Sequence, residues 1–411
     1  MKFIYNLSIY LTEAMFKLAS IINRKASLIV NGRRNWEVRL RDNLPEGGEL
    51  IWFHCASLGE FEQGRPLIEK MKEKRPETKV LLTFFSPSGY EIRKGYKYAD
   101  YICYLPADTP RNARKFISIS KPQKVVFVKY EFWYNYISEI RKNDIPLFLV
   151  SGIFRPDQHF FKWYGEFFRE MLKNFSYFFV QDRRSSELLS GIGLKNVTIA
   201  GDTRFDRVSQ IARESKSIPV IEKFAGSEKV FLAGSSWKED EEIITAYINA
   251  DPLKMKWIFA PHEIEPSNID RLERLFKTSV VRFSCFTEGS EKARVLIIDN
   301  IGLLASAYRY CHISAVGGGF GKGIHSILEP ACWGVPILFG PDHKSFREAI
   351  DLIEKGGAFC FGNGEDFSTS TNKLLNDPDH YLRTARITSE YVRENTGATE
   401  KIIDSLFEYR Y

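Results

Sequence analysis

The chain alternates short apolar runs with longer amphipathic stretches, and this alternation continues almost to its end. From residue 49 onward the apolar runs have the length of strands, and most segments between them have the length of helices. A series of strand–helix–strand units of this kind predicts a parallel, doubly wound sheet with helices on both faces. Because the chain has 411 residues, we expect two such domains, each with a core of its own.

Two series of strands can be separated. The first predicts strands at 50–55, 80–85, 101–105, 125–128, 147–150, 177–180 and 197–200. The second predicts strands at 230–233, 257–260, 295–298, 313–316, 337–339 and 358–361. A charged stretch without clear periodicity, residues 201–219, separates the two series, and we place the domain boundary there. The expected segments are 1–42, an amphipathic and basic stretch; 43–210, the first α/β domain; 211–385, the second α/β domain; and 386–411, a helix that could cross back onto the first domain.

The first thirty residues predict an amphipathic helix. Its apolar residues recur at alternating spacings of three and four, at Ile4, Leu7, Leu11, Ala14, Leu18 and Ile21. Polar residues interrupt the run, so we do not expect the helix to span a bilayer. Basic residues follow at Arg24, Lys25, Arg33, Arg34, Arg39 and Arg41. An apolar helical face followed by basic residues favours contact with an anionic membrane surface. The alternative is a helix packed on the first domain with a solvated basic flank.

Composition excludes several classes of protein. The net charge of +6 is too small to indicate nucleic-acid binding, although it suits an anionic surface or a phosphorylated substrate. The six cysteines form no C-x-x-C pair and mostly fall in apolar runs, which indicates buried thiols in a reducing compartment. The seven histidines show no metal-ligand spacing, and neither a P-loop nor an H-E-x-x-H motif is present. A metal-independent reaction without a cofactor is therefore the simplest expectation.

The most distinctive motif is glycine-rich and runs from Gly317 to Pro341, GGGFGKGIHSILEPACWGVPILFGP. It follows a predicted buried strand, so its backbone N–H groups could approach a phosphate. Ser326 and Glu329 have the spacing of a capping box, which predicts a helix starting at Ser326 and ending near Gly334. Glu329 could instead accept hydrogen bonds from a ribose. The alternative is a glycine-rich turn that binds nothing. The candidate donor-site residues in this motif are Gly318, Gly319, Gly321, Lys322, His325, Ser326 and Glu329.

The first domain offers a candidate general base. Ser57 and Gly59 permit a tight turn after the first strand, and Glu60 then opens the next helix. The helix dipole favours the charged form of a carboxylate there, so we expect Glu60 to be ionised at neutral pH and able to accept a proton. The alternative is a glutamate that only complements the dipole. Glu131, just past another strand, could act as a second carboxylate that positions a hydroxyl or orients a neighbour, or could simply cap a helix.

Other strand ends carry polar or small residues that could bind an anion. They are Ser86 and Ser88, Arg155, Gly234 and Ser235, and His262. A surface position is the plain alternative for Arg155, and a structural role is the plain alternative for His262.

Several motifs together resemble the 3-deoxy-D-manno-octulosonic acid (Kdo) transferases, which are GT-B glycosyltransferases. The matching pieces are residues 53–60, 131–133, 234–235, 260–262, 299–302 and the glycine motif. The resemblance implies two Rossmann-like domains facing a cleft. It implies that the domain 43–210 binds a lipid A precursor as acceptor and that the domain 211–385 binds the donor, CMP-Kdo. It also implies action at the cytoplasmic face of the bacterial inner membrane, with Glu60 as catalytic base and Glu131 as a second important acid.

The same resemblance places part of the donor site and marks two departures. It puts His262, Gly318, Gly319, Ser326 and Glu329 on the CMP side. The family commonly has His-Asn where this chain has His325-Ser326, and Pro-Arg-His where this chain has Pro-His-Glu at 261–263. An arginine is therefore missing from the expected phosphate region, and His262 or Lys322 could replace it. The remaining alternatives are a GT-B sugar-nucleotide 2-epimerase and a membrane-bound scaffold without chemistry.

Overall fold

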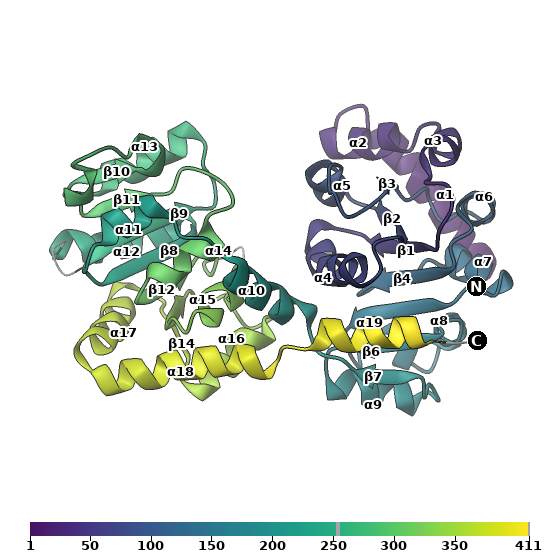
Figure 1. The fold of residues 1–411 in the computed structure, drawn as a ribbon. Coiled ribbons are helices and arrows are strands. Elements are labelled where there is room, and N and C mark those ends of the chain that lie inside the picture. The colour runs from purple at the N-terminus through teal and green to yellow at the C-terminus, as the bar shows by residue number, and fades with distance from the viewer. Residues whose placement is uncertain (252–254, 322, 410–411) are drawn as a thin grey trace. The chain divides into compact units, whose positions relative to one another are not determined.

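The computed structural model describes residues 1–251, 255–321 and 323–409, which form two compact units (Figure 1). Unit 1 comprises Met1–Asp206 together with Thr396–Tyr411, and unit 2 comprises Arg207–Asn395. The chain passes from unit 1 to unit 2 within helix α10 (Thr203–Glu214) and returns just after helix α18 (Pro378–Glu394).

The core of unit 1 is a parallel sheet of seven strands in the order β3-β2-β1-β4-β5-β6-β7. Its strands are β1 (Leu50–Cys55), β2 (Lys79–Phe84), β3 (Tyr101–Tyr104), β4 (Lys124–Val128), β5 (Leu147–Gly152), β6 (Tyr177–Val180) and β7 (Val197–Ile199). The predicted strands of the first series are confirmed to within one or two residues at their ends. The order reverses between β1 and β4, which pair in register from Ile51 with Lys124 to His54 with Phe127.

Helices cover both faces of this sheet, as Figure 1 shows. They are α1 (Lys2–Ala19), α2 (Arg24–Gly32), α3 (Trp36–Asn43), α4 (Leu58–Lys74), α5 (Pro87–Arg93), α6 (Pro110–Ser120), α7 (Tyr134–Lys142), α8 (Glu166–Leu172), α9 (Arg183–Gly191) and α19 (Ala398–Glu408). Residues His159–Phe161 form a 3-10 turn.

Unit 2 is built on a second parallel sheet of seven strands, in the order β10-β11-β9-β8-β12-β13-β14. Its strands are β8 (Val230–Ser236), β9 (Lys256–Pro261), β10 (Val280–Arg282), β11 (Val295–Ile297), β12 (Ile313–Val316), β13 (Ile337–Phe339) and β14 (Ala358–Cys360). The sequence did not predict β10, because three half-buried residues give no periodic signal. Here the order reverses between β8 and β12.

The helices of unit 2 again lie on both faces of the sheet (Figure 1). Besides α10 and α18 they are α11 (Pro219–Ala225), α12 (Lys238–Ala250), α13 (Pro266–Leu275), α14 (Leu304–Ala307), α15 (Leu328–Cys332), α16 (Arg347–Lys355) and α17 (Gly364–Asn376). Short 3-10 turns lie at Phe283–Cys285, Ser290–Lys292 and Tyr308–Tyr310. Both units are therefore doubly wound α/β folds, as predicted.

The stretch 201–219, where the sequence shows no clear period and where we placed the domain boundary, contains α10 and the start of α11. The first eight residues of α10 include two buried apolar side chains, Phe205 and Val208. Most of its remaining side chains are charged or polar, so the helix has too narrow an apolar stripe to show a period in the sequence.

Each sheet separates two apolar clusters, because side chains of a strand alternate between its faces. In β1, Trp52 packs with Phe127 and Tyr136 on one face, while Phe53 packs with Val126 on the other. The second face of unit 1 is completed by α19, whose Ile402, Ile403 and Leu406 are buried against that cluster. Residues near the end of the chain are thus part of the core of the first sheet.

Helix α1 is held to unit 1 by hydrogen bonds rather than by a buried apolar face. The Tyr5 hydroxyl donates to Asp108 Oδ2 at 2.6 Å, and Asn135 Nδ2 donates to Asn6 Oδ1 at 2.8 Å. Burial raises the pKa of Asp108 to about 6. No residue of α1 is buried. Its exposed apolar side chains are Phe3, Ile4, Leu7, Tyr10, Leu11, Met15 and Leu18, and Ile21 and Ile22 follow it.

The amphipathic helix predicted at the start of the chain is therefore present, with its apolar side unpaired. Within the residues described, no helix is both long and apolar enough to cross a bilayer. Membrane contact by this helix stays a prediction.

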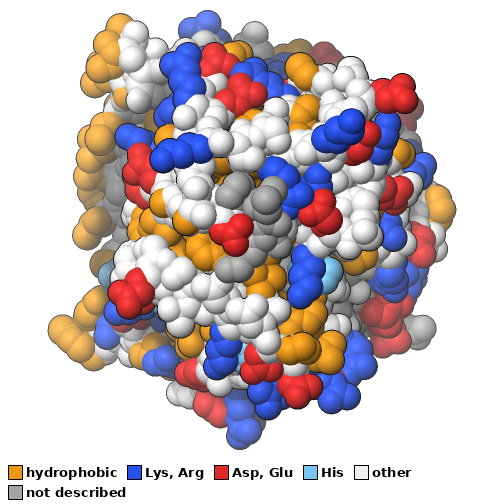
Figure 2. Space-filling view, turned by 90° about the vertical axis from the view of Figure 1, so that its left-hand side faces the viewer, with side chains coloured by type: hydrophobic (Ala, Val, Ile, Leu, Met, Phe, Trp, Pro, Cys, Tyr) orange, Lys and Arg blue, Asp and Glu red, His pale blue; other side chains and the backbone are white. Residues whose placement is uncertain are grey.

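Charges of both signs are distributed over the surface. On the face shown in Figure 2, lysine and arginine side chains are interspersed with aspartate and glutamate side chains. Neighbouring charges on that face offset one another at short range, so it presents no field of a single sign.

Candidate functional site

In unit 1 the two candidate carboxylates lie where the strand order of the sheet reverses. Glu60 follows β1 in the first turn of α4, and Glu131 follows β4. Strands β1 and β4 are neighbours, and their carboxyl ends lie at one edge of the sheet. In open α/β sheets, ligands bind at this edge, next to the point where the order reverses.

Glu60 is folded back on the loop that precedes its helix. Ser57 caps α4 by accepting a hydrogen bond from the Glu60 N–H at 3.4 Å, and the Glu60 carboxylate accepts one from the Ala56 N–H. The side chain is partly buried. Burial is the largest cause that raises the pKa of Glu60 to about 7, and the negative charge of Glu131 raises it further.

The prediction that the helix dipole keeps Glu60 fully ionised at neutral pH is therefore wrong. Loss of hydration outweighs both the dipole and the hydrogen bond from Ala56. A carboxylate with a pKa near 7 is a stronger base than a fully exposed one, and a substantial fraction of it is still ionised at neutral pH.

Glu131 is buried and held by two side chains. Its Oε2 lies 3.0 Å from His54 Nε2 and also accepts a hydrogen bond from Trp133 Nε1. It does not cap a helix, because α7 begins after Trp133 without a side-chain cap. The helix-capping alternative is therefore wrong, and the contacts with His54 and Trp133 fit the alternative in which Glu131 orients a neighbour.

His54 connects Glu131 to the interior of the sheet. Its Nδ1 lies 2.8 Å from the Thr83 hydroxyl, which also accepts a hydrogen bond from Trp52 Nε1 at 2.7 Å. Because an ionised carboxylate only accepts hydrogen bonds, the contact with Glu131 requires a proton on Nε2. Thr83 can then donate to Nδ1, so every polar group of the network has a partner.

The roles of His54, Thr83 and Trp133 were not predicted from the sequence. A signal was present, because His54 is a polar residue in the otherwise apolar run LIWFHC, and Thr83 occupies a similar place in LLTF. The contact between His54 and Thr83 depends on how β1 and β2 are aligned, because the register of these two strands pairs the two residues.

The backbone beyond β4 is also unusual. Lys129 has a φ of +69° and Ser151, near the end of β5, has a φ of +56°. Both residues carry side chains in the left-handed region, a strained conformation that occurs often at ligand sites. The positive charge of Lys129 lowers the pKa of Glu60 and so partly offsets the effect of Glu131.

The other candidates in unit 1 are closer to the surface. Ser86 caps α5 by accepting a hydrogen bond from the Ser88 N–H at 3.2 Å, and Ser88 is exposed. Arg155 is also exposed. Burial raises the pKa of Tyr130. The positive charge of Arg155 lowers this pKa and the negative charge of Glu60 raises it, so both side chains influence Tyr130.

In unit 2 the glycine loop follows β12 and meets the segment after β8, where the order of the second sheet reverses. Gly317 N–H donates to the Gly234 carbonyl at 3.0 Å, and Gly318 N–H donates to Asp240 Oδ2 at 3.0 Å. Burial raises the pKa of Asp240 to about 6. Its Oδ1 is buried without a hydrogen-bond partner in the parts of the chain that the structure describes. Asp240 is not distinctive in the sequence, because acidic residues surround it in the first turn of α12.

Three rings stack beside this loop. The ring of His262 lies 4.5 Å from the rings of both Trp237 and His325. Trp237 Nε1 donates to His325 Nε2 at 3.0 Å, so that nitrogen carries no proton. Burial, and secondly the charge of His262, lowers the pKa of His325 to about 4. His325 is therefore neutral at physiological pH, and His262 is exposed.

Not all of the glycines in the candidate site can serve as a cradle. A Cβ on Gly234 would lie 2.0 Å from the Tyr308 hydroxyl, and one on Gly319 would lie 2.5 Å from Gly340 Cα. At these two positions other atoms of the protein occupy the space that a side chain would need. Gly321 has open space around it and a φ of +115°, so it suits a close backbone approach. Gly318 has a left-handed φ of +95°, but a Cβ there would lie 2.4 Å from the Gly323 carbonyl oxygen, so this glycine too makes room for the protein itself.

The predicted capping box is absent. Helix α15 begins after Ile327 without a side-chain cap, and Ser326 is exposed in the loop. The His325 N–H donates to the Gly317 carbonyl at 3.1 Å, which draws this end of the loop back to β12. Glu329 lies in the first turn of a helix of only five residues, which ends at Cys332, within two residues of the predicted end near Gly334.

Lys322 lies outside the described residues. Within residues 1–251, 255–321 and 323–409, no three histidine, cysteine or acidic side chains are grouped to hold a metal ion.

Comparison with known proteins connects these features to a family. The family model of 3-deoxy-D-manno-octulosonic-acid transferase matches residues 33–207. A 3-deoxy-D-manno-octulosonic acid transferase of Aquifex aeolicus is 30% identical over 345 residues, which cover 82% of this chain and 88% of that protein. The chain belongs to the Kdo transferase family.

Other members of the Kdo transferase family show similar agreement. The transferase of Rickettsia prowazekii is 27% identical, covering 87% of this chain and 79% of that protein. The transferase of Haemophilus influenzae is 25% identical, and the match covers 89% of this chain and 87% of that protein. The family resemblance seen in the motifs is thus confirmed, and the chain is a glycosyltransferase by family.

Solved structures confirm the fold class. A UDP-GlcNAc 2-epimerase from Neisseria meningitidis has a TM-score of 0.63 at 16% identity, covering 88% of this chain and 100% of that chain. A putative UDP-N-acetylglucosamine 2-epimerase from Listeria monocytogenes has a TM-score of 0.61 at 14% identity, covering 89% and 98%. This likeness is one of fold alone, of the GT-B type, and does not favour an epimerase.

Proposed function

We propose that the protein transfers Kdo from CMP-Kdo to a lipid A precursor, with inversion at the anomeric carbon. Family membership supports the reaction class. The observation that supports the mechanism is the raised pKa of Glu60, about 7. This carboxylate lies where the strand order of unit 1 reverses. A base tuned to the working pH is what activation of an alcohol requires.

In this mechanism Glu60 takes the proton of an acceptor hydroxyl. The hydroxyl oxygen then forms a bond to the anomeric carbon of Kdo. The bond between that carbon and the phosphate oxygen breaks, and its electron pair leaves with CMP. The reaction ends with one proton on Glu60, which is released to solvent before the next turnover.

Glu131 has a supporting role in the proposal. Its contacts with His54 and Trp133 fix its position, and its charge raises the basicity of Glu60. Glu131 also has an accepting oxygen left for an acceptor hydroxyl. Ser57, Gly59, Ser86, Ser88 and Arg155 are proposed to line the acceptor side.

The donor is proposed to bind to unit 2. The departing phosphate would be stabilised by backbone N–H groups of the glycine loop, of which Gly321 has the space to approach a ligand. His262 is exposed beside Trp237 and can donate a hydrogen bond to a phosphate oxygen. The remaining candidates are Gly318, Ser235, His325, Ser326, Glu329 and Lys322, with Gly234 and Gly319 shaping the loop. The reaction needs no cofactor, and we propose that it needs no metal.

The lipid acceptor would be met at a membrane. The exposed apolar side of α1, followed by basic residues, supports peripheral contact with an anionic bilayer at the cytoplasmic face of the inner membrane. Deletion of residues 1–30 should release the protein from vesicles of anionic phospholipid in a sedimentation assay. Unchanged sedimentation would refute the membrane contact without affecting the transfer reaction.

One assay tests the reaction itself. The protein is incubated with CMP-Kdo, with and without a lipid A precursor, and free CMP is measured. We expect CMP release that depends on the acceptor. The same protein incubated with UDP-GlcNAc should give no epimer. Epimerisation, or a lack of acceptor-dependent CMP release by a folded protein bound to membranes, would favour the epimerase or the scaffold.

A further inference from the structure

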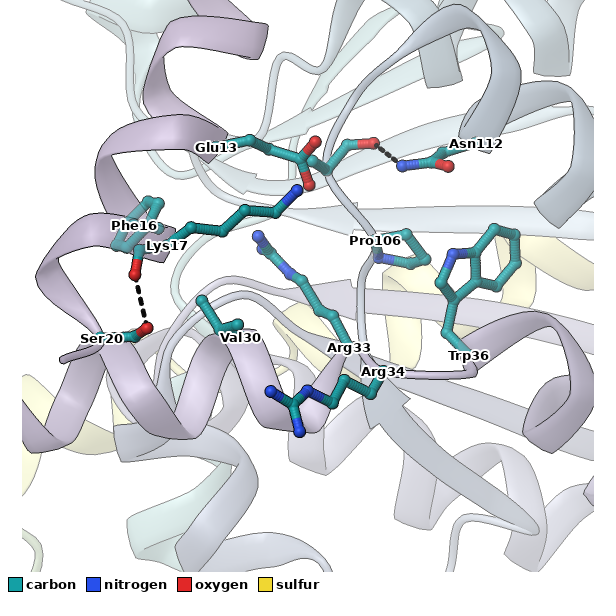
Figure 3. Close-up of a pocket in the computed structure, with 11 residues that line it drawn as sticks. Glu13, Phe16, Lys17, Ser20, Val30, Arg33, Arg34, Trp36, Pro106 and Asn112 are labelled. Carbon is teal, nitrogen blue, oxygen red and sulfur yellow. Dashed lines mark hydrogen bonds between the residues drawn. The ribbon is translucent and has the colours of Figure 1, made fainter.

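A pocket of about 540 Å³ opens in unit 1 between the first three helices and the segment after β3. Figure 3 shows its walls: Glu13, Phe16 and Lys17 from α1, Arg33 and Arg34 just past the end of α2, and Trp36 from α3. It is separate from the contacts of Glu60 and Glu131 described above, and the proposed transfer assigns no role to it.

The guanidinium of Arg33 is the most unusual group in this pocket. Its Nε and Nη2 are buried and have no hydrogen-bond partner among the described residues. One face of the guanidinium lies over the ring of Phe85, with Cζ 4.9 Å from the ring centroid. The N–H groups lie along the edge of the guanidinium, so the ring beneath its face accepts no hydrogen bond from them. Burial lowers the pKa of Arg33, which reflects the cost of keeping a charged group away from water.

The other charges of the pocket indicate which ligand would satisfy Arg33. Figure 3 shows Arg33 extending toward Glu13 and Lys17. Glu13 contributes one negative charge, which raises the pKa of Arg33 but does not offset the lowering caused by burial. Lys17 and Arg34 add two positive charges, and both are exposed. Three cations with one carboxylate leave an excess of positive charge. A phosphate matches the planar donors of an arginine, which bind two of its oxygens at once.

The position of the pocket indicates where such a phosphate would come from. Helix α1 forms one wall and also carries the row of exposed apolar side chains, including Leu11, Met15 and Leu18. A ligand with a phosphate head and an apolar tail could place its phosphate in the pocket and its tail against the exposed apolar side chains of α1. On the other side, Phe85 stacks on Trp133 with their centroids 5.2 Å apart, and Trp133 donates to Glu131. The pocket is therefore connected by ring contacts to the candidate catalytic carboxylates.

We propose that this pocket binds a phosphate group carried by a membrane lipid, with Arg33 as its principal ligand and Lys17 and Arg34 as supporting cations. The inference rests on the membrane contact proposed for α1. It adds a specific headgroup site to that contact and does not depend on the transfer reaction.

Vesicle flotation can test the site in the full-length protein. Vesicles of phosphatidylcholine alone are compared with vesicles containing phosphatidic acid, whose headgroup is a phosphate monoester. Any surface cation contributes about fivefold to binding of an anionic membrane. We expect Arg33→Gln to weaken binding to phosphatidic acid vesicles at least tenfold, and to leave weak binding to phosphatidylcholine unchanged. Arg41→Gln in α3, which removes the same charge from outside the pocket, should lower binding fivefold or less. Equal losses for the two variants would overturn the site.

A second measurement separates a ligand site from a structural role and from a free anion. The thermal midpoint is measured with inorganic phosphate and with a short-chain phosphatidic acid below its micelle concentration. The lipid should raise the midpoint of the wild type but not that of Arg33→Gln, and Arg33→Gln should be at least as stable as the wild type without ligand. An equal rise with inorganic phosphate would overturn the lipid. A large loss of stability in Arg33→Gln, with the lipid response retained, would assign Arg33 to the fold alone.

Discussion

Glu60 and Glu131 are coupled: the negative charge of Glu131 raises the pKa of Glu60, whose own burial already brings that pKa close to neutrality. Glu131 itself is fixed by His54 at 3.0 Å and by Trp133. The two carboxylates follow neighbouring strands of one sheet, so the fold holds them at the same edge. In the proposed mechanism Glu60 accepts a proton, and the charge of Glu131 raises the pKa at which it does so.

This coupling predicts a pH dependence. The folded pKa of Glu60 is raised to about 7, and in the proposed mechanism its ionised form is the base. Below pH 7 the rate constant kcat/KM should therefore fall about tenfold per pH unit, and above pH 7 it should level off. Glu131→Gln removes a negative charge, which lowers the pKa of Glu60 and should move the acidic limb to lower pH. A pH–rate profile of both proteins checks this, and an acidic limb that stays in place would contradict the coupling.

Replacement of the base should remove activity without unfolding the protein. Glu60→Gln keeps the shape of the side chain but cannot accept the proton, so we expect a loss of about 100- to 10,000-fold in kcat. The thermal midpoint should not fall, because the charged form of Glu60 is opposed by burial. Glu60→Ala should be inactive as well.

Glu62 on the same helix supplies the control, because it forms a surface ion pair with Arg93. Glu62→Gln should retain nearly full activity. Turnover of Glu60→Gln at the wild-type rate, measured as acceptor-dependent CMP release, would exclude Glu60 as the base.

The hydrogen bonds of Thr83 should matter for stability. Thr83→Val keeps the volume of the side chain but leaves Trp52 Nε1 and His54 Nδ1 without their buried partner. Each unpaired buried group costs about 1–3 kcal/mol, so urea unfolding should show a loss of at least about 2 kcal/mol. Thr12→Val on the exposed surface of α1 is the matched control and should change stability by less than about 0.5 kcal/mol. Equal effects at the two positions would show that the network contributes nothing.

The close approach at Gly234 predicts a steric effect in unit 2. A Cβ there would lie 2.0 Å from the Tyr308 hydroxyl, so Gly234→Ala should destabilise the protein by about 1–3 kcal/mol. Tyr308→Phe removes that oxygen and should recover part of the loss, although the ring carbon Cζ stays 2.9 Å away. A double-mutant cycle measures the recovery. Gly191→Ala, which meets nothing within 4 Å, is the control. Strict additivity would rule out the clash as the cause.

Much of the fold follows from local pattern. Apolar runs such as Leu50–Cys55 and Ile313–Val316 are buried strands at the predicted positions, because a parallel sheet covered on both faces requires continuous apolar runs. The pattern fails for β10, which is too short to show a period, and for α10, whose apolar stripe is narrow.

The candidate site was only partly predictable, since its chemistry depends on contacts between distant segments. The positions of Glu60 and Glu131 after strands follow from the sequence. The pKa of Glu60 does not, because it depends on burial and on the charge of Glu131. The contact of His54 with Thr83 requires the register of two strands. Likewise, spacing alone suggested a capping box at Ser326, whereas a hydrogen bond from His325 to Gly317 keeps that segment in the loop.

The placement of α19 has a consequence for how the molecule is made. Ile402, Ile403 and Leu406 fill the core beside β1 and β2, yet they are translated more than 300 residues after those strands. Throughout synthesis of unit 2, the sheet of unit 1 therefore waits with one apolar face incompletely covered. The part of the chain that leaves the ribosome first therefore completes its core only after unit 2 has been made, and the apolar surface left uncovered until residues 398–408 arrive favours aggregation.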